Sequence, residues 1–259
     1  MWLITGTVPD NHFDLSIDAV WADSDVSGDE LVLPDSRRLH IARGTTALAA
    51  TALLACRALG APQPRFLFAG DAGSGAGSEE AYHWLAANLG DVQVRLAPLT
   101  GLTFHYFYPD VDGHNRVYMA CEALSPKPLL VADAGFMYVA KVGGDATSYD
   151  VFTPDVGELA FLADEKAPHP FYTRGFLLAQ EEDMPNLLKR ALGADNCPQN
   201  MIIKGRADHI VCDGELVATV AEPSESAMEA IGGTGDIVTG LLTAYLASGQ
   251  PICRGELLA

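Results

Sequence analysis

Glycines and one threonine stand directly before an aspartate near the end of the sequence, in the segment AIGGTGDIVTG. Gly232, Gly233, Thr234 and Gly235 precede Asp236, and an apolar stretch that we predict to be helical follows. The first turn of a helix leaves backbone N–H groups without partners, and glycines before it let the chain curl around an anion. The segment therefore predicts a phosphate site.

Asp236 needs an explanation of its own, because a carboxylate at a phosphate site repels the ligand. It can take the proton of a hydroxyl that attacks the phosphate, or hold a metal ion or a water molecule. It can equally cap the helix, since aspartate is a favoured capping residue. A Walker loop is excluded, because that motif requires a GK pair followed by Ser or Thr. The spacing alone leaves base and cap open.

A second acidic pair, Asp155 and Glu158, lies in VFTPDVGELAFLADE, where a predicted strand leads into an amphipathic helix. Ligands of open α/β sheets bind at this carboxyl edge of the strands. The same two residues also have the spacing of a capping box, in which Asp155 caps the helix and Glu158 reaches back.

Two loops offer further candidates on the substrate side. The Gly/Ser-rich segment AGDAGSGAGSEEAYHWL contains Asp71, and we interpret it as a substrate loop or a mobile lid because it lacks the GxGxxG spacing. In PHPFYTRGFLL, Arg174 can meet a phosphate and His169 can carry a proton, although surface packing also explains such a loop.

The GGTGD string followed by an apolar helix resembles the nucleotide-binding signature of the ribokinase-like superfamily, and it is most similar to the NAD(P)H-hydrate dehydratases. The resemblance implies that Gly233, Thr234 and Gly235 hold the anion and that Asp236 is the catalytic base. It also implies ATP or ADP as phosphoryl donor and Mg²⁺ as cofactor.

Two more segments share this resemblance. TPDVGE is similar to the family's TPHPGE, whose glutamate places Mg²⁺ and phosphate, so Asp155 and Glu158 become candidates for that task; Asp155 stands where the family has histidine. MIIKGRADHIVCDGE is similar to the family's strand and Lys-Gly pair, which implies that Lys204 and Gly205 lie near the nucleotide phosphates. A lysine in solvent at a strand end is the alternative.

The elements that must position these residues alternate between strands and helices, which predicts a mostly parallel central sheet with helices on both faces. We expect strands in WLIT, RFLFAG, DVQVRL, PLLVAD, YDVFT and NMIIK, and helices over Thr45–Leu59, Glu79–Asn88, Val156–Ala163, Met184–Leu192 and Asp236–Ala247. Asp-Gly turns predict two antiparallel pairs, a hairpin over Leu102–Ala120 and an edge pair in HIVCDGELVATV. We expect one ribokinase-like domain over residues 1–259.

Composition limits the partners. Sixteen Lys and Arg against 34 Asp and Glu give a net charge of −18, so we expect neither nucleic acid nor a membrane as partner. The five cysteines are widely spaced and form no CxxC pair, which argues against a disulfide framework and a zinc site and favours a reduced, cytoplasmic setting. We also expect a homo-oligomer.

Three functions remain open. The first is a nucleotide-dependent NAD(P)H-hydrate dehydratase, the second is a kinase for a sugar or another small molecule on the same scaffold, and the third is a nucleotide-binding sensor without turnover. The resemblance is concentrated in residues 128–250, and the N-terminal half is similar only in its alternation of elements. The acceptor of the phosphate is thus not identified by the sequence.

Overall fold

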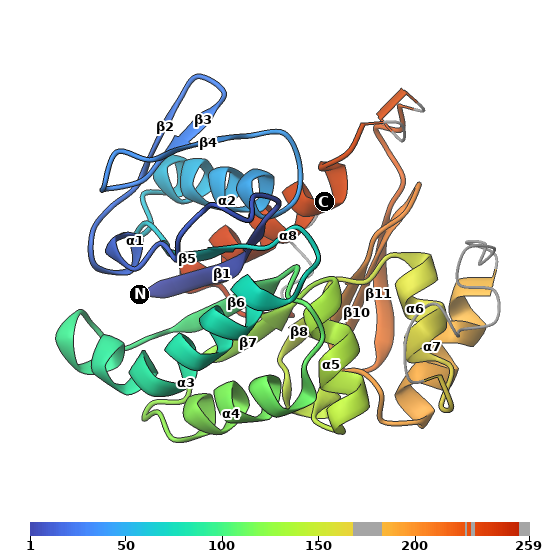
Figure 1. The fold of residues 1–259 in the computed structure, drawn as a ribbon. Helices are drawn as coiled ribbons and strands as arrows, with labels where there is room; N and C mark the ends of the chain where they lie inside the picture. Colours follow the sequence, from blue (N-terminus) through green and yellow to red (C-terminus); the bar gives the residue numbers. More distant parts are fainter. Residues whose placement is uncertain (168–182, 226, 229–230, 254–259) are drawn as a thin grey trace.

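The central element is a large sheet, seen in a computed structural model that describes residues 1–167, 183–225, 227–228 and 231–253 (Figure 1). In the described residues it has eight strands in the order β11 (Glu215–Val220), β10 (Asp208–Cys212), β9 (Met201–Ile203), β8 (Val151–Phe152), β7 (Leu129–Ala132), β6 (Gly101–His105), β1 (Trp2–Val8) and β5 (Arg65–Gly70). The predicted central sheet is confirmed.

Strand direction follows the prediction as well. The neighbours from β5 to β9 pair in parallel, whereas β10 pairs antiparallel with both β9 and β11. Asp213 and Gly214, both with positive φ, form the turn between β10 and β11, so the expected antiparallel edge pair is confirmed.

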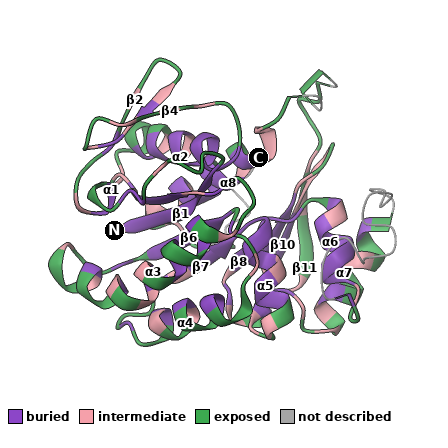
Figure 2. Cartoon of the chain, viewed as in Figure 1, coloured by how far each residue is buried: buried purple, intermediate pink, exposed green. Residues whose placement is uncertain are grey.

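Helices cover both faces of this sheet (Figure 1). One face carries α3 (Ala76–Arg95), α4 (Val111–Glu122), α5 (Gly135–Gly143), α6 (Val156–Leu162) and α7 (Met184–Gly193), and the other carries α2 (Thr45–Leu59) and α8 (Thr234–Ala247). Successive residues of β1 point to opposite faces of the sheet. Leu3 packs in the α3 layer, whereas Trp2 and Ile4 pack in the α2 layer. Figure 2 shows the central strands of the large sheet buried between these layers, whereas the edge strand β11 is largely exposed.

Smaller elements complete the chain. A three-stranded antiparallel sheet of β2 (Asp25–Ser27), β3 (Glu30–Val32) and β4 (Arg38–His40) lies beside α2, and the short helices α1 (Asp18–Trp21) and η1 (Ala146–Ser148) fill connections. Among the described helices, none is both long and apolar enough to cross a membrane.

The predicted hairpin over residues 102–120 is wrong. Its first half is β6, but its second half is helix α4, which starts where the side chain of Asp110 accepts a hydrogen bond from the amide of Asp112. The Asp-Gly pair therefore lies in the first turn of a helix. Gly113 is required there for another reason, since a Cβ at this position would lie 2.9 Å from the ring of Tyr82.

The predicted strand DVQVRL is also wrong, because α3 continues to Arg95 and includes most of it. Leu85, Leu89 and Val92 are buried at helical spacing, whereas Val94 is 84% exposed. A strand would have placed Val92 and Val94 on the same face, so the alternation in the sequence was fortuitous.

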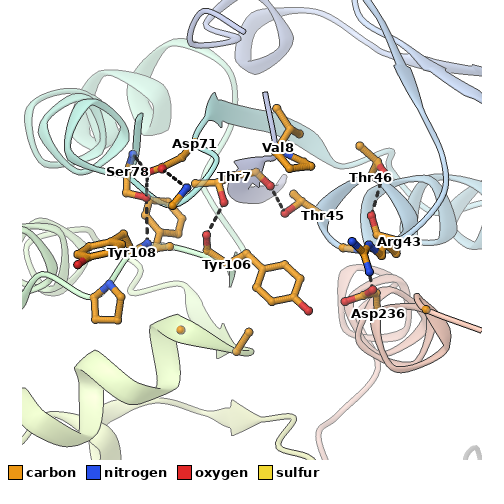
Figure 3. Close-up of a pocket in the computed structure, with 18 of the residues that line it drawn as sticks. Thr7, Val8, Arg43, Thr45, Thr46, Asp71, Ser78, Tyr106, Tyr108 and Asp236 are labelled. Atoms are coloured by element: carbon orange, nitrogen blue, oxygen red, sulfur yellow. Dashed lines mark hydrogen bonds between the residues drawn. The ribbon is translucent and has the colours of Figure 1, made fainter. Parts of the chain in front are cut away.

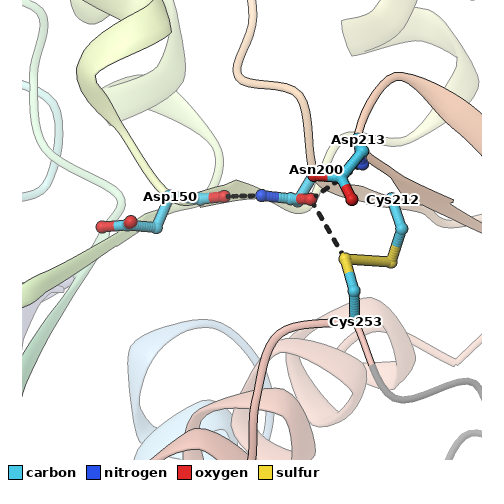
Figure 4. Close-up of a disulfide and its surroundings, with 5 residues drawn as sticks. All are labelled: Asp150, Asn200, Cys212, Asp213 and Cys253. Carbon is cyan, nitrogen blue, oxygen red and sulfur yellow. Dashed lines mark hydrogen bonds between the residues drawn. A yellow bond between two sulfur atoms is a disulfide. The ribbon is translucent and has the colours of Figure 1, made fainter.

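Two of the five cysteines are paired, contrary to the expectation of reduced thiols throughout. The segment that follows α8 returns to the sheet edge and brings Cys253 to a Cα–Cα distance of 5.7 Å from Cys212, where the two form a disulfide (Figure 4). Asn200 lies beside the bond, with its side-chain oxygen 3.2 Å from the sulfur of Cys253. The spacing of 41 residues gave no signal for this pairing, which depends on the path of the chain.

Candidate active site

A cavity of about 780 Å³ opens at the carboxyl ends of β1, β5, β6 and β7 (Figure 3). The chain enters the sheet at β1, adds β5 on one side and then β6 on the other, so the cavity lies where the winding of the sheet reverses. Its lining is mostly apolar and aromatic, with Asp236, Arg43 and the start of α2 among its polar members. Such a cavity is large enough for a metabolite-sized ligand.

Asp236 lies at the inner wall of this cavity, in the first turn of α8, and its side chain does not cap that helix. Its Oδ2 instead accepts a hydrogen bond of 2.6 Å from the amide of Gly44, at the start of α2, and its Oδ1 lies 3.0 Å from Nε2 of His105. The capping interpretation of Asp236 is therefore wrong. The side chain joins α8 to α2 and β6.

The charge of Asp236 is supported by its neighbours. Burial by itself would raise the pKa of this carboxyl, but the hydrogen bond and charge of His105, the Gly44 amide and the charge of Lys204 outweigh it, so the pKa lies below the usual value for aspartate. A carboxylate that stays ionised and borders a cavity is able to accept a proton.

His105 belongs to a buried chain of polar groups that the sequence did not reveal. Its Nδ1 lies 3.0 Å from Oγ1 of Thr45, and that hydroxyl donates a 2.6 Å hydrogen bond to the carbonyl oxygen of Thr7. His105 is fully buried on β6. We missed it because the predicted hairpin placed His105 in an edge ribbon, away from the glycine loop.

The side chain of Lys204 is only 13% exposed and is paired with a carboxylate, which contradicts the interpretation as a solvated lysine. Its ammonium lies 2.8 and 2.9 Å from the two carboxylate oxygens of Asp133, at the end of β7, and the charges of Asp133 and Glu158 hold its pKa above the usual value despite burial. Lys204 also lies against the start of α8, since a Cβ at Gly235 would be 3.5 Å from its Cδ. Asp133 was not predicted.

Three polar side chains of α8 face the sheet. Asp236, Thr239 and Thr243 are buried, and Thr239 donates a 2.6 Å hydrogen bond to Oδ2 of Asp133 while Thr243 pairs with Thr103 on β6. Their spacing of three and four residues places them on one side of the helix. Polar residues at this spacing in an otherwise apolar helix were the available signal for the buried network.

The glycine loop before α8 lies against the start of α2. Gly233 has φ of 105°, and a Cβ there would lie 3.0 Å from the carbonyl oxygen of Ala42. Gly232 and Gly233 line the cavity together with Arg43, which is an exposed basic residue at its edge. Thr234 and Gly235 form the first residues of α8.

Asp155 and Glu158 form the capping box that their spacing suggested. The side chain of Asp155 accepts from the amide of Glu158, and Glu158 accepts from the amide of Asp155 and from the hydroxyl of Tyr138. Burial, with the charges of Asp155 and Asp133, raises the pKa of Glu158 to about 7 against the opposing influence of Lys204.

The carboxylates around Lys204 outnumber its single positive charge, and this surplus of negative charge fits the implied Mg²⁺. Asp133, Glu158 and Asp236 all act on the single ammonium of Lys204, and Asp155 adds a fourth carboxylate next to Glu158. Carboxylate oxygens are the ligands that Mg²⁺ prefers, and a bound cation would offset both the burial of Glu158 and the neighbouring negative charges, which together raise its pKa. Asp155 and Glu158 are thus suited to the metal-placing task.

His105, Asp133 and Asp236 also lie together, with three potential ligand atoms within 4.8 Å of one another. Lys204 already neutralises Asp133 there, and Asp236 is bonded to an amide and to His105. We therefore interpret this cluster as charge-paired side chains and assign no metal ion to it.

The pKa of Glu158 predicts a pH-dependent stability. The Glu158 carboxyl binds its proton more tightly in the folded protein, where its pKa is about 7, than in the unfolded chain, where the pKa is near 4.5. The free energy of unfolding should therefore fall as the pH rises from about 4.5 to about 7. In metal-free buffer, Glu158→Gln should remove about 1–3 kcal/mol of that fall. Urea unfolding of both proteins across this pH range tests it, and parallel pH profiles would contradict it.

The remaining predicted residues divide into three groups. Asp71 borders the cavity, but its carboxylate accepts from the amides of Gly73, Gly75 and Ser78 and from the Ser78 hydroxyl, so it organises the start of α3. The amide of Gly205 donates to Asp208 in a turn. His169 and Arg174 lie outside the described residues.

Tyr106 was not predicted and follows His105 directly. It has φ of 53°, a conformation that bulky residues rarely adopt, and its ring lies against the imidazole of His105 at a centroid distance of 4.1 Å. Tyr106 is 50% exposed, and its partial burial together with the charges of Asp236, Asp133 and Glu158 raises the pKa of its phenol to about 12. Tyr106 therefore enters the cavity as a neutral side chain close to the acidic groups (Figure 3).

Known proteins resemble this chain in sequence. Residues 115–256, more than half of the 259, match the family described as NAD(P)H-hydrate dehydratase. The uncharacterized protein MJ1337 of Methanocaldococcus jannaschii is 35% identical over 179 residues, which are 69% of this chain and 70% of that protein.

Solved structures share the fold at low identity. A mutant phosphofructokinase-2 of Escherichia coli has a TM-score of 0.54 at 13% identity, over 97% of this chain and 88% of that one. A ribokinase-like superfamily protein of Enterococcus faecalis V583 has 0.52 at 14%, over 95% and 71%. A phosphomethylpyrimidine kinase described as putative, from Bacteroides thetaiotaomicron, has 0.51 at 16%, over 96% and 80%. The fold is therefore the predicted ribokinase-like α/β fold.

Proposed function

Because the chain belongs to the NAD(P)H-hydrate dehydratase family, we propose that it is a nucleotide-dependent phosphoryl-transfer enzyme that dehydrates a hydrated nicotinamide nucleotide. In this reaction a nucleotide phosphorylates the hydroxyl of the hydrate, and phosphate is then eliminated. The observation that carries the proposal is the ionised carboxylate of Asp236, which borders the cavity beside the glycine loop.

Asp236 acts as the general base. It takes the proton of the acceptor hydroxyl as the oxygen attacks the phosphorus, so positive charge does not build up on an attacking oxygen that still carries its proton. The N–H groups at the start of α8 stabilise the charge on the transferred phosphoryl group, since they point toward the loop and carry the positive end of the helix dipole.

Asp155 and Glu158 would hold Mg²⁺, which supplies positive charge to the phosphates when it is bound. Lys204 places a further positive charge behind the glycine loop, and its bonds to Asp133 keep the ammonium in position. The protein is strongly acidic overall, so these local groups provide the affinity for a phosphate donor.

A small-molecule kinase on the same scaffold is the second candidate, and the distribution of the family match supports it. The match covers residues 115–256, which include Asp236, Glu158 and Lys204. Most of the cavity wall comes instead from residues 7–9, 43–46, 71–78 and 106–109, outside the matched segment. The proposed phosphoryl-transfer groups thus lie within residues 115–256, which match the family. The residues that would contact the acceptor lie mostly before residue 115.

The purified protein with Mg²⁺ should restore the absorbance of NADH from NADH hydrate when one of the two nucleotides, ATP or ADP, is present. Reactions without nucleotide, without Mg²⁺ and without protein are the controls. Recovery with release of free phosphate would support the dehydratase. A stable phosphate ester of another acceptor, without NADH recovery, would reject it in favour of the kinase, and nucleotide binding without turnover on any acceptor would reject both.

A further inference from the structure

We infer that His105 is a positioning residue for Asp236: an imidazolium that donates from both ring nitrogens and fixes the carboxylate in its ionised, cavity-facing state. The catalytic consequence rests on the proposed function of Asp236, whereas the protonation of the ring follows from contacts alone. His105 lies outside the segment that matches the family, so the match does not assign it a role.

The hydrogen bonds on the Nδ1 side identify the donor. Thr45 has one hydroxyl proton, and Oγ1 lies 2.6 Å from the carbonyl oxygen of Thr7, which can only accept. The Thr45 hydroxyl therefore uses its proton there. It has only lone pairs left for His105, whose Nδ1 lies 3.0 Å away. Nδ1 must carry a proton and donate it to Thr45.

On the other side of the ring, Nε2 faces a group that is a natural acceptor. Oδ1 of Asp236 lies 3.0 Å from Nε2, and Oδ2 of the same carboxylate is bonded to the amide of Gly44. The competing arrangement places the shared proton on Asp236 and leaves Nε2 bare. Asp133, 3.9 Å from Nε2, favours a charged ring, and the ammonium of Lys204 favours a charged Asp236, so each of them opposes that arrangement.

The surroundings contain few other groups that can change this balance. Tyr106 packs its ring against His105 with a phenol that stays neutral, and Thr103 on the same face of β6 is bonded to Trp2 and Thr243. His105 is fully buried, so water does not compete for its two hydrogen bonds in the structure.

Another buried histidine provides the contrast. His114 is also fully buried, but its Nε2 pairs with the hydroxyl of Tyr149 at 2.8 Å, and burial lowers its pKa. Asp145 lies 4.0 Å from its Nδ1, which is too far for a hydrogen bond, and the ring does not border the cavity. His114 is thus a structural histidine and a matched control for the removal of a buried imidazole.

Nitrogen NMR of the protein labelled with ¹⁵N-histidine tests the protonation directly. We expect both ring nitrogens of His105, assigned by backbone correlation in the wild-type protein, to show a directly bonded proton at neutral pH. In Asp236→Asn the amide can donate to Nε2, so only Nδ1 should remain protonated. A single protonated ring nitrogen in the wild type, or an unchanged ring in Asp236→Asn, would overturn the inference.

The pH profile of turnover tests the positioning role. With His105→Gln, which removes the charge but keeps an amide donor, the acid limb of kcat should move upward by about 1–3 pH units at saturating Mg²⁺, which keeps Glu158 ionised, with the KM for nucleotide unchanged. His114→Gln should leave the limb in place. If His105→Gln does not fold, Thr45→Val provides a second variant for the same measurement. An acid limb of kcat that does not move in the folded variant would contradict the positioning role of His105.

The two proposals fail in different ways. Absence of turnover on every acceptor removes the proposed function, while the NMR measurement still decides the state of His105. A singly protonated His105 in an active enzyme overturns the inference and leaves the proposed function in place.

Discussion

Asp236→Asn should lower turnover by roughly 100- to 10,000-fold and leave the affinity for nucleotide nearly unchanged. An amide has no basicity for the acceptor proton, yet it has nearly the size and shape of the carboxylate. The variant should also fold, because an amide oxygen can accept from the amide of Gly44 and the amide nitrogen can donate to His105. The loss should therefore appear in kcat, measured with saturating nucleotide and Mg²⁺.

Asp112→Asn is a suitable control for the charge itself. Asp112 is an exposed acid in the first turn of α4 and does not border the cavity, so its replacement removes one negative charge at a distance from the site. Turnover of this control should match that of the wild type. Full activity of Asp236→Asn would remove Asp236 from the mechanism, whereas loss of nucleotide binding would show that the carboxylate organises the loop.

Lys204→Met should destabilise the protein by about 3–5 kcal/mol, the largest stability effect that we expect from a single substitution here. The ammonium is bonded to both oxygens of Asp133, whose side chain is 2% exposed. Methionine fills much of the lysine stem's volume but leaves this carboxylate buried without its cation. Urea unfolding at neutral pH measures the effect.

The double variant Lys204→Met, Asp133→Asn separates the charge from the packing. Asparagine retains an oxygen that can accept from Thr239 or from the amide of Ala134, the two other donors to Asp133. We therefore expect it to recover a large part of the lost free energy of unfolding. A double variant less stable than Lys204→Met would show that the destabilisation comes from lost contacts of the lysine stem instead of the unpaired carboxylate.

Local patterns were sufficient for much of the fold. Helix α2 has the predicted bounds, and the buried strand RFLFAG is β5 as expected, because apolar periodicity and length distinguish these segments. The Asp-Gly signal gave one correct turn at Asp213 and one error at Asp112. The difference lies in the neighbouring residues: Asp110 caps a helix, and Tyr82 packs over Gly113.

The sequence predicts the candidate site only where the functional residues are close together along the chain. The loop around Gly233 and the position of Asp236 follow from one short segment, and the capping box of Asp155 and Glu158 from another. The hydrogen-bond partners of Asp236 could not be predicted in this way, since Gly44 is 192 residues away and His105 is 131 residues away. Lys204 and Asp133 meet across 71 residues, and no spacing in the sequence reports such contacts.

These long separations have a consequence for how the protein becomes active during synthesis. Asp236 contacts Gly44 and His105 only after α8 has left the ribosome and docked beside α2, so most of the chain must be made before the site exists. Contacts of high sequence separation form late because the loop-closure entropy must first be overcome. We therefore expect chains interrupted before α8 to lack the candidate site and to expose the apolar α2 face of the sheet, which favours aggregation.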